Sequence, residues 1–189
     1  MVKQRDRIVS VRVGEMAMLD LAQYIRDVPD FPKPGILFKD ITPLLAHPQA
    51  FRESIDRMCE HFRDRPVDAV AAAEARGFLF AAPIAYLLHR PLVPLRKPGK
   101  LPYRTHNLAY ELEYGQAELQ VHIDSIKPHA QILLVDDVLA TGGTMLAGCQ
   151  LVEKAGGKVL ACAFLLELGF LKGRERLRDY EVFTLLRFD

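Results

Sequence analysis

The sequence contains no tryptophan and only three cysteines, Cys59, Cys149 and Cys162, among its 189 residues. The cysteines are odd in number, widely spaced and without a CxxC pair, so we expect reduced thiols packed in or near the core. The six histidines form neither an HxH nor an HExxH pattern, and we therefore expect no zinc site and no metal ligands from the protein. Neither a disulfide framework nor a common zinc motif organises this chain.

Long hydrophobic runs and an excess of charge of one sign are absent as well. No stretch approaches the roughly 18 to 20 apolar residues of a membrane span, and the charged start MVKQRDRIVSVRVGE lacks the apolar segment of a signal peptide. The formal net charge is +1, which gives no reason to expect a nucleic-acid or membrane partner. We expect a cytoplasmic protein with one domain, since half of the residues are hydrophobic.

Short apolar runs alternate with amphipathic segments along most of the chain. We expect strands at residues 67–73, 92–95, 132–135, 159–166 and 182–186, and helices at residues 48–63, 78–88 and 144–155. This alternation predicts an α/β fold in which helices cover both faces of a parallel sheet, with right-handed crossovers between the strands.

The N-terminal quarter departs from this alternation. Within residues 15–27, Met18, Leu21 and Ile25 share one stripe, which predicts a helix. Residues 30–45 contain too many prolines for a helix and too many apolar side chains for a solvated linker. We expect an ordered loop there.

A second departure occupies residues 97–121. Its first part is basic and rich in proline and glycine, and it is followed by two alternating segments, 108–113 and 117–121. This pattern predicts a long loop that leads into an antiparallel hairpin. Loops of this length within a domain are commonly functional lids.

The sharpest chemical feature is an apolar strand that we expect to end in Asp136 and Asp137, followed by a turn of Gly and Thr at 140–144 and then a helix. Ligands of open parallel sheets bind beyond the carboxyl ends of strands, and the free N–H groups at a helix start suit a phosphate. Gly142 and Gly143 would allow close approach, and the two carboxylates could accept hydrogen bonds from ribose hydroxyls. The alternative is a helix cap beside two solvated aspartates. Neither GxxxxGK[ST] nor GxGxxG occurs, so this is not a Walker or a dinucleotide loop.

The run Asp136-Asp-Val-Leu-Ala-Thr-Gly-Gly-Thr144 resembles the 5-phosphoribosyl-1-pyrophosphate (PRPP) motif of type I phosphoribosyltransferases, in the form typical of adenine-specific members. Three other parts of the chain resemble, in the expected order, the purine-side loop, the pyrophosphate loop and the flexible catalytic loop of that family: Phe31–Asp40, Glu74–Phe78, and Arg96–Pro102 with Leu112–Gly115. The resemblance implies a Rossmann-like parallel-sheet core at 46–189 with a flexible loop at about 97–115. It also implies a small N-terminal hood within 1–45, and it leaves residues 1–17 uncovered.

The resemblance implies a role for each matching residue on the PRPP side. The cradle for the 5′-phosphate would be Ala140, Thr141, Gly142, Gly143 and Thr144, and the ribose contacts would be Asp136 and Asp137. Pyrophosphate would contact Arg76, in a loop of unusual peptide conformation, and also Arg96, Lys97 and Lys100, some of them from a neighbouring subunit.

The purine side follows from the same resemblance. The main chain of Leu37 and Lys39 would recognise adenine, with Phe38 packed on its ring. Glu113 would be the acid/base group near the purine nitrogens, and Arg96 would assist catalysis.

The implied reaction is purine salvage by a glycosyltransferase of the pentosyl class, which joins adenine to PRPP and gives AMP and pyrophosphate. Mg²⁺ is expected to arrive with PRPP, held by its oxygens and by water rather than by a protein cage. Arg, Lys, Mg²⁺ and backbone N–H groups would stabilise the departing pyrophosphate. The family also implies a homodimer.

Two alternatives stay open at this point. One keeps the reaction and changes the base to hypoxanthine, guanine or xanthine, which require a side-chain donor rather than an acceptor at C6. The other is a PRPP-sensing transcription regulator, although the residues before the first expected helix are too few for an added DNA-binding module.

Overall fold

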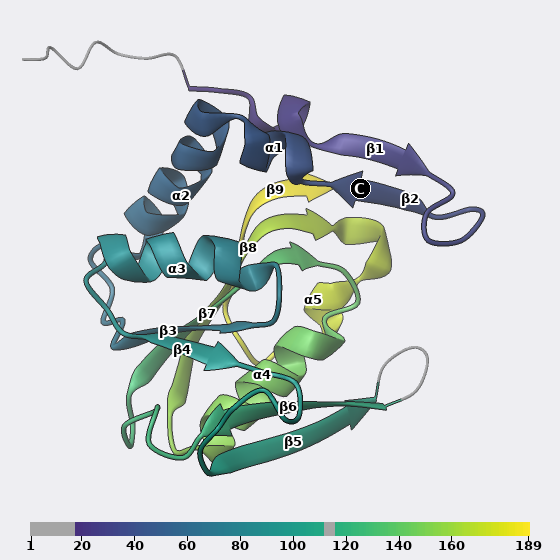
Figure 1. Ribbon diagram of the computed structural model, residues 1–189. Helices are drawn as coiled ribbons and strands as arrows, with labels where there is room; N and C mark the ends of the chain where they lie inside the picture. Colours follow the sequence, from purple (N-terminus) through teal and green to yellow (C-terminus); the bar gives the residue numbers. More distant parts are fainter. Residues whose placement is uncertain (1–17, 112–115) are drawn as a thin grey trace, which may run out of the picture.

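The computed structural model describes residues 18–111 and 116–189 and has a five-stranded parallel sheet at its centre (Figure 1). The order across the sheet is β4-β3-β7-β8-β9, and every neighbouring pair is parallel. These strands are, in chain order, β3 (Ala69–Ala73), β4 (Leu92–Leu95), β7 (Gln131–Leu139), β8 (Lys158–Leu168) and β9 (Val182–Phe188). The predicted parallel α/β fold is confirmed.

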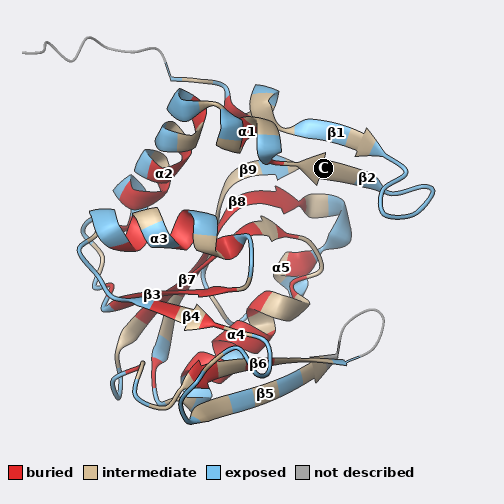
Figure 2. Ribbon diagram, in the orientation of Figure 1, coloured by how far each residue is buried: buried red, intermediate tan, exposed pale blue. Residues whose placement is uncertain are grey.

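Helices cover both faces of this sheet. Helices α2 (Pro48–Phe62) and α3 (Gly77–Leu87) lie on one side and α4 (Gly143–Lys154) on the other (Figure 1). Successive side chains of a strand point to opposite faces, so Leu133 joins the core under α2 and α3, whereas Leu134 joins the core under α4. Figure 2 shows the result as buried strands between two layers of helices. The three cysteines are buried and free, as predicted.

The N-terminal region folds differently from our expectation. The predicted helix over 15–27 is wrong in its described part, which forms a 3-10 turn, Leu21–Tyr24, and a strand, β1 (Arg26–Pro29). Asp20 accepts a hydrogen bond from the Ala22 N–H, which caps the short turn, and the chain then extends to pair with a second strand. Local capping and strand pairing therefore outweigh the helical stripe.

The expected loop over 30–45 is also only partly correct. It contains β2 (Leu37–Asp40), which pairs antiparallel with β1, and it runs into α1 (Thr42–Ala46). Pro43 lies in the first turn of α1, where its missing N–H costs no intrahelical hydrogen bond.

The predicted antiparallel hairpin is confirmed as β5 (Thr105–Glu111) and β6 (Gln116–His122). It is a separate two-stranded sheet, joined to the chain after β4 by a bridge between Arg96 and Gln120. After β8 the chain makes a 3-10 turn, Gly169–Leu171, and a one-turn helix, α5 (Gly173–Arg176). No helix within 18–111 or 116–189 has the length and apolarity that crossing a membrane would need.

Candidate functional site

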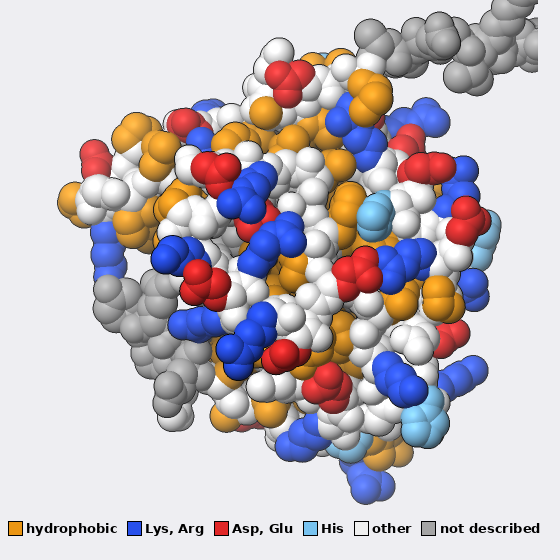
Figure 3. Space-filling view, turned by 180° about the vertical axis from the view of Figure 1, so that it is seen from behind, with side chains coloured by type: hydrophobic (Ala, Val, Ile, Leu, Met, Phe, Trp, Pro, Cys, Tyr) orange, Lys and Arg blue, Asp and Glu red, His pale blue; other side chains and the backbone are white. Residues whose placement is uncertain are grey.

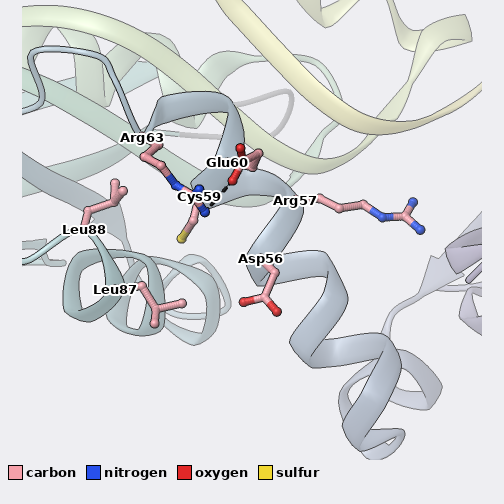
Figure 4. Close-up of a pocket in the computed structure, with 7 residues that line it drawn as sticks. All are labelled: Asp56, Arg57, Cys59, Glu60, Arg63, Leu87 and Leu88. Atoms are coloured by element: carbon pink, nitrogen blue, oxygen red, sulfur yellow. Dashed lines mark ion pairs between the residues drawn. The ribbon is translucent and has the colours of Figure 1, made fainter. Parts of the chain in front are cut away.

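Surface charge alone does not locate the site. On the face drawn in Figure 3, basic and acidic side chains are interspersed. A groove of about 530 Å³ between α2 and α3 contains Cys59, but burial raises the pKa of that thiol to about 11, and an ion pair joins Glu60 to Arg63 beside it (Figure 4). A protonated thiol beside paired charges offers little chemistry.

A second hollow, of about 720 Å³, lies at the carboxyl ends of the strands. The chain segments around it include the loops after β3, β4 and β7 and the β5–β6 hairpin, through Glu74, Lys97, Pro98, Ala109, Tyr110, Gln116, Ala117, Glu118, Leu119 and Thr144. Ligands of open parallel sheets bind at this edge. The strand ends therefore define the candidate site.

The turn between β7 and α4 is shaped as an anion cradle. Gly142 caps the helix with φ +81°, in the left-handed region, and no side chain caps the helix start. The first N–H groups of a helix have no intrahelical acceptor, and they carry the positive end of the helix dipole. This turn, which includes Ala140, Thr141, Gly143 and Thr144, can thus hold a phosphate by its backbone.

Gly142→Ala is expected to weaken binding of ribose 5-phosphate at least tenfold. A left-handed backbone costs alanine roughly 1–2 kcal/mol, and the added Cβ would lie only 2.7 Å from the Gly173 carbonyl oxygen. Gly156→Ala is the matched control, because Gly156 has φ +89° and its nearest neighbour is 4.0 Å away. Titration calorimetry measures the affinity of both variants for ribose 5-phosphate. Equal affinities would contradict the assignment of this turn as the phosphate cradle.

The two aspartates do not end the strand as we expected, because β7 continues through them to Leu139. Backbone pairing with β8 carries the strand on: Asp136 pairs with Phe164, and Val138 pairs with Leu166. Asp137 is buried, and its Oδ2 lies 2.8 Å from Nε of Arg76 without the alignment of a hydrogen bond. Among the described residues, this buried oxygen has no aligned hydrogen-bond donor, so its capacity to accept a hydrogen bond is unused.

The pKa of Asp136 is raised well above its usual range, mainly because burial disfavours the charged form and secondly because the Asp137 carboxylate is adjacent. Gly77, the first residue of α3, packs closely against this carboxyl group, since a Cβ on Gly77 would lie 2.8 Å from Oδ1 of Asp136. The pair therefore places one acid that resists ionisation beside one that faces an arginine.

The raised pKa predicts a pH-dependent effect of Asp136→Asn on stability. The unfolded carboxyl ionises near pH ~3.9, whereas the folded one keeps its proton to higher pH, so the free energy of unfolding of the native protein falls as pH rises between those two values. Asparagine cannot ionise, and the variant should therefore gain stability relative to the native protein as pH rises above ~3.9. Urea unfolding at a series of pH values above that point would contradict the assignment if the difference in free energy of unfolding stayed constant.

Arg76 lies at the start of α3, directly after the loop that follows β3. Its guanidinium is close to Asp137 and lies over the Phe38 ring, 5.7 Å from the ring centroid. The Glu74–Ala75 peptide before it is cis, in agreement with the unusual loop conformation that the resemblance implies. The structure thus brings together the β1–β2 hairpin, the loop after β3 and the aspartates of β7.

The expected basic loop lies beside this centre. Arg96 forms an ion pair with Glu74 and donates a hydrogen bond to its carboxylate. The hydrogen bond holds the pKa of the Glu74 carboxyl below its usual range. Lys97 contributes to the strand-end hollow, whereas Lys100 is exposed and is not part of its lining. Glu113 lies outside the described residues.

The purine-side residues are on β2. Lys39 pairs with Asp27 at 2.6 Å and lies 4.3 Å from the centre of the Phe188 ring, so its side chain is already engaged. Leu37 is exposed, and Phe38 packs edge-on against Phe31. The side chains of Lys39 and Phe38 are thus in contact with other side chains of the protein, whereas that of Leu37 is exposed.

Three residues that shape the candidate site were not predicted individually from the sequence. Glu74 holds Arg96, Gly77 admits Asp136, and Gly173 packs against the cradle from α5. The first two stand within the pyrophosphate-loop match, which was a usable signal. Gly173 lies far along the chain, and its sequence neighbours give no sign of this contact.

Comparisons with known proteins agree with this geometry. The model of the phosphoribosyl transferase domain matches residues 40–188. The adenine phosphoribosyltransferase of Chloroflexus aurantiacus is 54% identical over 173 residues, which cover 92% of this chain and 100% of the relative. The crystal structure of the Thermoanaerobacter pseudethanolicus enzyme of that name has 49% identity and a TM-score of 0.86, covering 89% and 98% of the two chains.

A solved structure with lower sequence identity to this chain contains adenine. Adenine phosphoribosyltransferase from Saccharomyces cerevisiae, complexed with an imino-altritol bisphosphate and adenine, is 38% identical with a TM-score of 0.82. The alignment covers 87% of this chain and 96% of the yeast chain.

Proposed function

Because the chain belongs to the adenine phosphoribosyltransferases, within the phosphoribosyl transferase domain family, we propose that its strand-end loops perform that family's reaction. The reaction transfers the 5-phosphoribosyl group of PRPP to adenine, gives AMP and pyrophosphate, and salvages a free purine. The observation that carries the assignment of the site is the meeting of Arg76, Asp137 and Phe38 beside the cradle that follows β7.

The PRPP side of the proposal rests on charge. The cradle at 140–144 would hold the 5′-phosphate by backbone N–H groups, and Asp136 and Asp137 would accept hydrogen bonds from the ribose hydroxyls. Arg76, Arg96, Lys97 and Lys100 would stabilise the pyrophosphate as it leaves with its negative charge.

Bond breaking at the anomeric carbon develops positive charge on the sugar. The carboxylate of Asp137, buried one sugar away from the phosphate, would stabilise that charge more strongly than a solvated group could. Exclusion of water by the loop at about 97–115 would protect the reacting sugar from hydrolysis.

Recognition of adenine would use the main chain of Leu37 and Lys39, with Phe38 against the ring. Adenine presents an amino group at C6, which a backbone carbonyl can accept, whereas a 6-oxopurine needs a donor there. The position of the Lys39 side chain supports this preference, because its ammonium is paired with Asp27 and packed over the Phe188 ring. Glu113 is proposed as the acid/base group; unchanged turnover in Glu113→Gln would remove it.

Mg²⁺ is proposed to bind together with PRPP. Asp136 and Asp137 offer carboxylates at the sugar, but no three or more Asp, Glu, His or Cys side chains within the described ranges are grouped to hold a metal. Phosphate oxygens and water would complete the six oxygen ligands that Mg²⁺ prefers, and the ion would neutralise charge on the leaving pyrophosphate. Full activity in excess chelator would contradict this proposal.

A homodimer and a cytoplasmic location complete the proposal. The outer face of α3 exposes Leu79, Tyr86 and Leu87, an apolar surface suited to a second copy of the chain. A monomer mass in sedimentation at micromolar concentration would contradict the dimer. Fluorescence microscopy of a tagged protein that showed it outside the cytoplasm would contradict the location.

The test is a panel of purines. Pyrophosphate release from PRPP with Mg²⁺ should be at least a hundredfold faster in kcat/KM with adenine than with hypoxanthine or guanine, because an unpaired buried polar group carries a penalty of that order or more. Equal rates for adenine and hypoxanthine would select the 6-oxopurine alternative. Sequence-specific, salt-dependent duplex binding without turnover would select the regulator.

A further inference from the structure

An ion pair between a buried carboxylate, Glu167, and a partly exposed guanidinium, Arg174, lies behind the phosphate cradle, on the side of β8 and β9. Glu167 is only 2% exposed and pairs in register with Leu139, the last residue of β7 before the cradle. Arg174 Nε donates to both oxygens of Glu167, at 2.9 and 2.8 Å. A carboxylate this deeply buried requires such a partner, because an unpaired charge in the interior is strongly unfavourable.

The same guanidinium fixes the short helix α5 to the sheet. Its Nη1 donates to the Val182 carbonyl at 3.0 Å, and its Nη2 donates to the Thr184 hydroxyl at 3.1 Å. Thr184 in turn donates to Glu167 at 3.2 Å. Arg174 thus holds one turn of helix against both β8 and β9 by bonds in a fixed planar geometry.

The residue before Arg174 touches the cradle directly. Gly173 is buried against it: a Cβ on Gly173 would overlap the Ala140 carbonyl oxygen, and a Cβ on Gly142 would meet the Gly173 carbonyl oxygen at 2.7 Å. The cradle has no side-chain cap of its own and depends on a left-handed glycine. Its conformation therefore depends on the segment packed behind it.

We propose that Arg174, held by Glu167, is a positioning residue for the phosphate cradle: it fixes Gly173 against Ala140 and Gly142 and so sets the backbone N–H groups that grip the 5′-phosphate. This inference rests on the proposed function of the cradle. Glu167 also lies 3.7 Å from Arg187, which itself pairs with Asp189, so the two acids and two arginines balance in charge. The effect of Arg174 is therefore to fix geometry rather than to attract the anion. The effect should therefore fall on phosphate ligands and spare the base.

The test compares ligands in Arg174→Ala by titration calorimetry, with steady-state kinetics alongside. We expect the Kd for ribose 5-phosphate and the KM for PRPP to rise about tenfold, because small displacements of binding groups weaken their contacts steeply. Adenine binding should change less than about twofold. Arg178→Ala is the matched control, since Arg178 is an exposed arginine soon after α5 with only a 3.9 Å pair to Asp179.

A second variant keeps the test decisive if Arg174→Ala does not fold. Arg174→Lys retains the charge opposite Glu167 but cannot make the fork of bonds to Val182 and Thr184, so we expect an intermediate rise in Kd for ribose 5-phosphate. An unchanged Kd in a folded Arg174 variant, or equal losses for adenine and ribose 5-phosphate, would overturn the inference. A native protein that binds no ribose 5-phosphate would overturn the proposed cradle and this inference together, whereas normal native binding with an unaffected variant would overturn the inference alone.

Discussion

Replacing both Asp136 and Asp137 with asparagine should lower kcat/KM for PRPP by about a thousandfold, since loss of a single preorganised charge contact already costs about 10²–10³. The substitution removes the negative charge opposite the sugar, where positive charge develops as pyrophosphate leaves. It also removes the carboxylate that faces Arg76 at 2.8 Å. Steady-state kinetics with PRPP as the varied substrate measures the effect.

The fold should survive this double substitution. Asparagine keeps the shape of aspartate, and the raised pKa of Asp136 means that a neutral side chain already suits that position. Circular dichroism and thermal unfolding are the controls, and Asp179→Asn, on an exposed side chain, should leave kcat/KM unchanged. Wild-type turnover in the double variant would remove the ribose assignment.

Arg76→Ala should weaken PRPP and pyrophosphate roughly 30- to 150-fold, as expected for loss of a hydrogen bond from a charged donor, about 2–3 kcal/mol. The guanidinium is half exposed at the site, near Asp137, where it can turn to a phosphate. Adenine should lose less than about threefold, because only the contact of Arg76 with the Phe38 ring is affected. Product-inhibition constants for pyrophosphate, with KM values for both substrates, separate the two effects.

The matched control is Arg52→Ala, which removes an arginine whose side chain is exposed on α2 and pairs with Asp56 at the helix surface. It should leave all three constants unchanged. Losses of equal size for adenine and pyrophosphate in Arg76→Ala would mean that the residue supports the fold rather than the leaving group.

The core of the fold was predictable because its physical signal is local. Continuous apolar runs of four residues, such as 132–135, favour buried strands, and the helices between them have clear apolar faces. The β4 prediction matches the observed bounds, Leu92–Leu95. By contrast, β7 extends past Asp136 because backbone pairing with β8 continues under polar side chains, and a sequence pattern does not record pairing.

The N-terminal errors have the same origin. A three-residue stripe predicted a helix, yet the cap at Asp20 and the antiparallel pairing of β1 with β2 determine the backbone there. Strand partners such as Arg26 and Asp40 are 14 residues apart, so their pairing depends on tertiary structure rather than on the local sequence. Local propensity is a weak guide in such a segment.

The candidate site divides in a similar way. The cradle, the two aspartates and Arg76 lie in contiguous motifs, so the sequence alone could single them out as candidates. The Glu74–Arg96 pair and the Gly173 contact join segments that are distant in sequence, and only the folded chain brings them together. The Glu167–Arg174 pair belongs to the same class, since its seven-residue separation across a turn carries no recognisable pattern.

A crystal structure with AMP bound would test the cradle most directly. The account predicts phosphate oxygens at about 2.7–3.2 Å from backbone nitrogens within 140–144, the ribose hydroxyls on Asp136 and Asp137, and the base beside Phe38. A phosphate held elsewhere, with the turn after β7 making no contact to the nucleotide, would contradict it.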